Sequence, residues 1–313
     1  MKKITAFFQI IRWQNLLFIV VAQLLFHYCI LQPNLAQINE LPQIKNSHLL
    51  FIIFASILIA AGGNIINDYF DLNIDKINKP EKLVVDKYIS RRWAIFLHLF
   101  LSLTGIMCSV YVAHRLNLFW LSVANTLTVL LLFIYSSSLK KKLLIGNIVV
   151  SILTAWVILV LVIPEYNIPK NSTEFKTNIY DKILRLGILY SSFSFIISVI
   201  REVIKDMEDV DGDRKNGCTT MPIVLGLNAT KTFVAVWLIV LIALLVIAQV
   251  YVIRFKWWFS ILYATTFLII PLLIVLKQLF TAQSSADFHK LSSTIKWIMF
   301  AGILSMLFFK IYE

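Results

Sequence analysis

Residues 64–82 read NIINDYFDLNIDKINKPEK and close an apolar run long enough to lie in a membrane. Asp68, Asp71 and Asp75 have the spacing i, i+3, i+7, which puts their carboxylates on one face of a helix. Asn67 joins this face with the spacing i, i+4, i+8. Like charges on one face repel each other, so this first acidic motif indicates that a divalent cation sits among the side chains.

The same spacing returns at Asp206, Asp209 and Asp213, which again follow a long apolar run and form a second acidic motif. Of the 17 acidic residues, five lie in 68–86 and six in 202–213, so the acids are concentrated in these two windows. Mg²⁺ takes oxygen ligands and usually shares them with substrate phosphates. Two acidic faces at the ends of two membrane helices therefore predict a pair of Mg²⁺ sites that face each other.

The composition is that of a polytopic membrane protein. The 313 residues are 59% hydrophobic, with a mean hydropathy of +0.81 and only 15% charged residues, whereas a soluble domain carries about a quarter. The net charge of +12 is read as loop charge near anionic lipid and not as nucleic-acid binding. The three cysteines are odd in number and far apart, so neither a disulfide framework nor a thiolate metal site is expected.

Apolar runs of spanning length predict an all-α fold with nine transmembrane helices in a single domain over residues 1–313. The predicted spans are about 15–32, 48–67, 93–113, 116–135, 143–163, 183–205, 233–253, 257–276 and 295–312. The break between the third and fourth spans is placed at His114–Arg115, and 33–47 and 164–182 are predicted loops.

The distribution of basic residues predicts the orientation. With an interior N-terminus, the loops on one side hold 20 Lys and Arg and the loops on the other hold 9. The positive-inside rule then places the N-terminus and both acidic motifs at the cytoplasmic face of a bacterial inner (cell) membrane.

Other polar residues on the same side are candidates for the site. Lys140, after the fourth span, is expected to reach a diphosphate and stabilise it as a leaving group, although a basic membrane cap is an alternative. Arg201, just before the second acidic motif, either neutralises the acids or binds phosphate. Asn15, at the start of the first span, either caps the helix or lines the pocket.

A purely structural explanation of the two acidic motifs is that they lie at solvated helix ends, where the carboxylates pair with nearby lysines. Against it, charged residues near membrane depth are costly, about 2.5–3.5 kcal/mol each on insertion scales, and mark function by default. A functional site is favoured because one spacing is repeated at two helix ends.

The two acidic motifs resemble the signature motifs of the UbiA superfamily of intramembrane prenyltransferases. The likeness extends to Asn78-Lys79-Pro80, to the segment Tyr135-Ser136…Lys140, and to Thr219-Thr220-Met221-Pro222 followed by Gly226. It covers essentially the whole chain. Within the superfamily, the first acidic motif is most similar to the digeranylgeranylglyceryl phosphate synthase branch.

The resemblance implies a helical barrel around a central cavity, where Mg²⁺ holds the diphosphate of a polyprenyl donor. It implies metal-site roles for Asn67, Asp71, Asp209 and Asp213, of which Asp71 and Asp209, with Lys140, are the expected catalytic residues. The residues expected at the substrate are Asn15, Asp68, Asp75, Tyr135, Lys140, Arg201 and Asp206. The expected acceptor is a lipid-like hydroxyl compound such as geranylgeranylglyceryl phosphate.

Two alternatives stay open, and a third is excluded by the motif it would need. Within the same class, the acceptor is an aromatic quinone precursor such as 4-hydroxybenzoate or 1,4-dihydroxy-2-naphthoate. In another class, the acids form the path of an intramembrane cation transporter, although a transporter favours acids near the bilayer midplane. A CDP-alcohol phosphotransferase would need a single acidic motif with interleaved Ala-Arg and Gly, which this sequence lacks.

Overall fold

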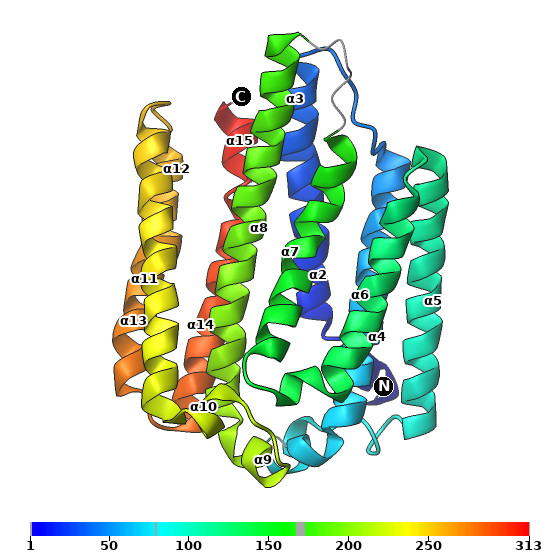
Figure 1. Cartoon of the computed structure of the whole chain (residues 1–313), viewed down its shortest axis with the longest axis vertical. Helices are drawn as coiled ribbons and strands as arrows, with labels where there is room; N and C mark the ends of the chain where they lie inside the picture. The colour runs from blue at the N-terminus through cyan, green and yellow to red at the C-terminus, as the bar shows by residue number, and fades with distance from the viewer. Residues whose placement is uncertain (1, 79, 167–172, 313) are drawn as a thin grey trace.

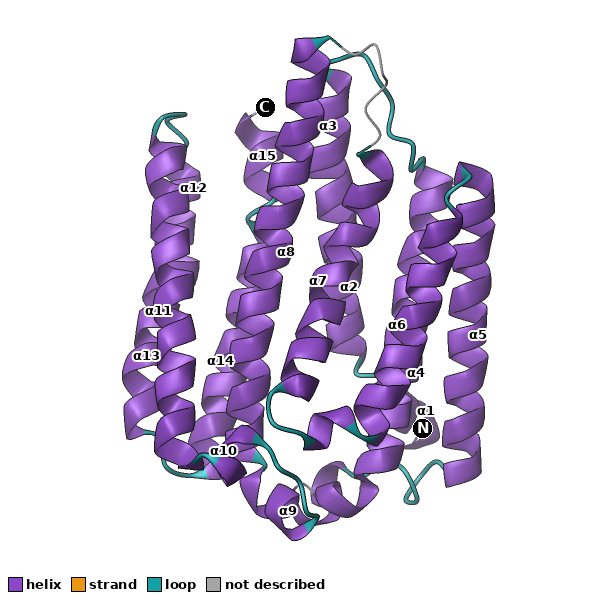
Figure 2. Cartoon of the chain, viewed as in Figure 1, coloured by secondary structure: helices purple, strands orange, loops and turns teal. Residues whose placement is uncertain are grey.

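The structure is a computed structural model that describes residues 2–78, 80–166 and 173–312. Within these ranges the chain forms helices joined by loops and short turns, with no strand (Figure 2). Nine of the described helical segments are long and apolar enough to cross a membrane, which confirms the predicted fold class. They run roughly alongside one another, with the N-terminus at one end of the bundle and the C-terminus at the other (Figure 1).

The first five spans are α2 (Trp13–Leu25) continued by a π-helical turn (Phe26–Leu31) and α3 (Gln32–Ala36), then α4 (Asn46–Asn78), α5 (Arg91–Leu116), α6 (Phe119–Ser137) and α7 (Ile145–Glu165). The last four are α8 (Glu174–Glu208), α11 (Gly226–Ile253), α12 (Trp258–Ala264) continued through a π-helical turn (Thr265–Ile269) into α13 (Ile270–Thr281), and α14 (Ser285–Leu304) followed by α15 (Leu307–Tyr312). Short helices lie outside the spans: α1 (Lys2–Ile10), α9 (Val210–Lys215), α10 (Met221–Val224) and the 3-10 turns Pro80–Lys82 and Leu139–Lys141.

Several helices are longer than predicted. α4 continues to Asn78 and so contains the whole first acidic motif, since neither Gly nor Pro interrupts the chain between Gly63 and Pro80. The predicted break at His114–Arg115 is wrong, because α5 continues to Leu116. The chain turns at Asn117, whose left-handed backbone (φ 56°) suits asparagine.

Two features predicted from the sequence fall partly outside the described residues. The structure does not describe Lys79 of the stretch Asn78-Lys79-Pro80. It also does not describe residues 167–172, which belong to the predicted loop 164–182.

Small residues let α4 and α5 pack closely. A Cβ on Gly105 would lie 2.9 Å from Cγ1 of Ile59 and 3.2 Å from the carbonyl oxygen of Ala55. Because lipid offers no hydrophobic drive between helices, membrane helices associate through close packing of this kind. Gly105 therefore sets the distance between α5 and the helix that carries the first acidic motif.

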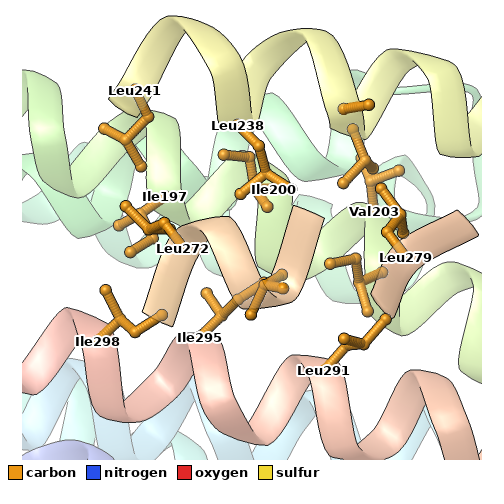
Figure 3. Close-up of a cluster of buried hydrophobic side chains, with 14 of the residues drawn as sticks. Ile197, Ile200, Val203, Leu238, Leu241, Leu272, Leu279, Leu291, Ile295 and Ile298 are labelled. Atoms are coloured by element: carbon orange, nitrogen blue, oxygen red, sulfur yellow. The ribbon is translucent and has the colours of Figure 1, made fainter. Parts of the chain in front are cut away.

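Branched aliphatic side chains from four helices form the largest buried cluster (Figure 3). Ile197, Ile200 and Val203 of α8 pack there against α11, α13 and α14. This packing stabilises the end of α8, from which the second acidic motif begins.

Two acidic residues at the end of the bundle opposite the acidic motifs form contacts that stabilise the fold. The carboxylate of Glu165, at the end of α7, accepts hydrogen bonds from the backbone N–H groups of Gln43 (3.0 Å) and Ile44 (2.7 Å). Glu40 accepts hydrogen bonds from Lys176 and Tyr180 of α8. These contacts hold the loop between α3 and α4 against α7 and α8, away from both acidic motifs.

Candidate active site

A cavity of about 970 Å³ runs through the bundle between α2, α4, α6, α7, α8 and α14. All seven residues of the two acidic motifs line it, together with Lys140. Farther into the bundle its walls are largely apolar, with side chains such as Leu153, Phe193 and Met306. The cavity therefore joins an acid-rich polar end to an apolar interior.

The first acidic motif lies on one continuous helix, as its spacing predicts. Nδ2 of Asn67 donates a hydrogen bond to Oδ2 of Asp71 over 2.7 Å, one helical turn away. Asp68 forms an ion pair with Arg12 (2.8 Å), which precedes α2 and caps it with a left-handed backbone. Asp75 lines the cavity one turn beyond Asp71. The motif presents oxygen atoms along one wall of the cavity.

The second acidic motif is not on one helix, which corrects the expectation drawn from its spacing. α8 ends at Glu208, Asp209 adopts a non-helical backbone (φ −100°, ψ 10°), and α9 starts at Val210. Asp206 therefore lies in the last turn of α8 and Asp213 in a separate short helix. Both still line the cavity, and Asp206 accepts a hydrogen bond from Nδ2 of Asn147 on α7 (2.9 Å).

Asn78, the last residue of α4, joins the two motifs. Its Nδ2 donates to the carbonyl oxygen of Asp209 (3.0 Å), and its Oδ1 accepts from the backbone N–H of Gly212 (2.8 Å). A Cβ on Gly212 would overlap with the carboxamide of Asn78. The bend between α8 and α9 is therefore held by the end of α4, and it requires a glycine at 212.

Lys140, in the 3-10 turn after α6, lines the cavity and contacts the first acidic motif. Its Nζ forms an ion pair with Asp71 and lies 3.4 Å from Oδ1 of Asn67. Burial, followed by the charge of Arg12, lowers the pKa of Lys140 to about 7. The local geometry again depends on a glycine, since a Cβ on Gly146 would meet the backbone of Lys140.

The other residues predicted at the substrate line the same cavity. These are Asn15 in the first turn of α2, Tyr135 near the end of α6, and Arg201 in α8. Arg201 forms an ion pair with its neighbour Glu202 (2.8 Å).

Two cavity residues were not singled out from the sequence: Glu202, which was only counted among the clustered acids, and Lys296. The role of Asn78 at the bend between α8 and α9 was also missed, because its contacts are tertiary. The signal for Lys296 would have been a lysine inside an apolar helix.

The donor set suits Mg²⁺ shared with a substrate. Among the described residues, no three His, Cys, Asp or Glu side chains converge closely enough to hold a metal by themselves. Mg²⁺ commonly binds through one or two carboxylates and completes its shell with water and substrate phosphates. Carboxylates from both acidic motifs line one end of the cavity, so the residues present fit Mg²⁺ bound together with a diphosphate.

These features define a membrane-spanning helical protein with an acid-lined pocket that suits a phosphorylated, lipid-like molecule. The chain belongs to the UbiA prenyltransferase family, whose sequence profile matches residues 35–304. The resemblance noted from the two acidic motifs is thus confirmed.

Individual relatives agree with this family. Over 193 residues the chain is 35% identical to digeranylgeranylglyceryl phosphate synthase of Thermococcus gammatolerans, and the alignment covers 62% of each protein. The match thus spans less than two thirds of that relative.

Two solved structures share the fold. A structure of digeranylgeranylglyceryl phosphate synthase in membranes has a TM-score of 0.64 at 22% identity, covering 98% of both chains. A UbiA homologue from Archaeoglobus fulgidus bound to GPP and Mg²⁺ has a TM-score of 0.56 at 13% identity, covering 96% of this chain and 99% of the other.

Proposed function

We propose that this protein transfers a polyprenyl group from a prenyl diphosphate to the hydroxyl group of a lipid-like phosphate ester, of the geranylgeranylglyceryl phosphate kind. The observation that carries the proposal is the continuity of the cavity. Its acid-lined end suits a diphosphate with Mg²⁺, and its apolar interior suits a prenyl chain. The name of the Thermococcus gammatolerans relative supports the acceptor.

The protein's own residues have separate tasks in this proposal. Asn67, Asp71, Asp209 and Asp213 would hold Mg²⁺, which supplies positive charge to the leaving diphosphate. Lys140 donates hydrogen bonds to the same diphosphate, because its ammonium lies at the first acidic motif.

The remaining residues orient and shield the reactants. Asp68, Asp75 and Asp206 line the same pocket that would hold the diphosphate, together with Asn15 and Tyr135. The enclosed apolar walls keep water away from the allylic carbon as its bond to oxygen breaks. The acceptor hydroxyl then attacks this carbon, releasing a proton and the diphosphate.

A panel of acceptors tests the proposal. Purified protein in lipid nanodiscs receives geranylgeranyl diphosphate, Mg²⁺ and one acceptor: geranylgeranylglyceryl phosphate, 4-hydroxybenzoate or 1,4-dihydroxy-2-naphthoate. We expect mass spectrometry to find the prenylated product with the phosphate ester and diphosphate release that stops in excess chelator. Prenylation of an aromatic compound alone would replace this acceptor with a quinone precursor, and cation flux without diphosphate release would favour a transporter.

The proposed orientation places the polar end of the cavity at the cytoplasmic face of the cell membrane. Lys215 ends α9, and Lys87 lies in the loop between α4 and α5; both are exposed, and both segments are at this end of the bundle (Figure 1). The exposed Lys45 directly precedes α4, whose first residue lies toward the other end. In a background without native cysteines, we expect an impermeant thiol reagent to label Lys87→Cys and Lys215→Cys from the cytoplasmic side. The matched Lys45→Cys variant should react from outside, and labelling of the first two from opposite sides would contradict the orientation.

A further inference from the structure

Lys296 lies inside a membrane-spanning helix and faces the cavity. It is 11 residues from the start of α14 at Ser285, which is about 16 Å along the helix. A lysine at such a position is costly and marks function by default. Lys296 therefore needs an explanation beyond loop charge.

The contacts of Lys296 leave its charge without a counter-ion. Its Nζ donates a hydrogen bond to Oε1 of Gln14 on α2 (3.0 Å) and lies 5.6 Å from the ring centroid of Phe18. In the described part of the chain, no carboxylate forms an ion pair with it. A neutral amide and an aromatic face hold the ammonium in place without cancelling its charge.

Two further cations nearby, Arg201 and Lys205 on α8, share a single carboxylate. Glu202 accepts from Nη1 of Arg201 (2.8 Å) and from Nζ of Lys205 (3.0 Å). Nε of Arg201 is buried and has no hydrogen-bond partner among the described residues. A buried donor left unsatisfied costs free energy that a bound acceptor atom would recover.

These cations belong to one region of the cavity. Lys296, Arg201 and Lys205 all line it, and Arg201 is close enough to act on Lys296 electrostatically. Arg201 and Lys205 share the carboxylate of Glu202, and Lys296 adds a third positive charge that no described carboxylate pairs with. Lys140, by contrast, is bound to the first acidic motif on α4. The cavity therefore has a second anion-attracting region in addition to the site where Mg²⁺ and Lys140 would hold the donor.

We propose that Lys296, Arg201 and Lys205 bind the phosphate monoester of the acceptor, and that Lys296 determines the preference for a phosphorylated acceptor. This inference rests on the proposed function and assigns Arg201 to the acceptor rather than to the donor diphosphate. Convergent Lys and Arg donors suit a phosphate. Phe18, beside Lys296 and also in the cavity wall, offers an apolar surface to the tail of the same molecule.

The test compares geranylgeranylglyceryl phosphate with geranylgeranylglycerol, which lacks the phosphate, as acceptors for wild type and Lys296→Gln. Glutamine keeps a hydrogen-bond donor but removes the charge. Because a hydrogen bond to a charged group contributes substantially, we expect kcat/KM for the phosphate ester to fall about 10- to 100-fold. The value for the unphosphorylated acceptor and the KM for the donor should stay within about twofold. A general structural defect would instead lower kcat/KM equally for both acceptors.

Lys290→Gln is the matched control, because Lys290 is exposed on the same helix and does not line the cavity. Lys290→Gln should leave kcat/KM for both acceptors unchanged. Thermal unfolding should show that both variants are folded. Suppose that wild type uses the phosphate ester. If Lys296→Gln then prefers the phosphate ester as strongly as wild type does, or if its kcat/KM falls equally for both acceptors, the proposed role of Lys296 is overturned. If wild type uses neither glycerol compound, the proposed function itself fails, and this inference with it.

Discussion

Asp71→Asn and Asp209→Asn are each expected to lower the rate of prenyl transfer by at least about 10²-fold, the size of effect seen when a group that stabilises developing charge is removed. Each change replaces a carboxylate at the acid-lined end of the cavity with a neutral amide. The expected reason is weaker binding of Mg²⁺ beside the leaving diphosphate. Transfer of labelled geranylgeranyl groups at saturating Mg²⁺ measures the loss.

Asp211→Asn controls for the loss of one negative charge in the same segment. Asp211 lies between Asp209 and Asp213 but is exposed and does not line the cavity, so its replacement should keep wild-type activity. Because Asp71 also forms an ion pair with Lys140, thermal unfolding of Asp71→Asn is measured in parallel. Full activity of either cavity variant, or activity that survives excess chelator, would contradict a Mg²⁺ site built from the two motifs.

Hydropathy and spacing are enough to predict the bundle and the first acidic motif. Spans of apolar residues are a local property, and Asp68, Asp71 and Asp75 share a helix face because α4 continues unbroken to Asn78. The second acidic motif has identical spacing but bends at Asp209. That bend depends on Asn78, which is 134 residues from Gly212, so local periodicity could not reveal it.

Lys296 shows a different limit of sequence reasoning. A hydropathy window tends to end a span at charged residues, so a span predicted from 295 places Lys296 at its border with a loop. In the structure α14 begins at Ser285, and Lys296 lies three turns inside it. Only the position of α2 beside α14 shows that Gln14 and Phe18 hold this lysine toward the cavity.

Gly212→Ala is expected to remove most prenyl transfer by displacing the second acidic motif. The added methyl group would overlap with the carboxamide of Asn78, which is fixed by hydrogen bonds to Asp209 and to residue 212 itself. Moving that carboxamide breaks both hydrogen bonds, which are worth about 0.5–1.5 kcal/mol each. Since a shift of about 1 Å at a reacting site can cost about 10²-fold in rate, we expect a loss of this size.

A double-mutant cycle with Asn78→Ala shows whether this contact is the cause. Asn78→Ala removes the same two hydrogen bonds but also makes room for the methyl group at 212. The two substitutions should therefore be non-additive, with the double variant no less active and no less stable than Asn78→Ala alone. Transfer rates and thermal unfolding of the four proteins measure the coupling. Losses that add would show that Gly212 acts through another contact, and that Asn78 does not hold the two motifs together.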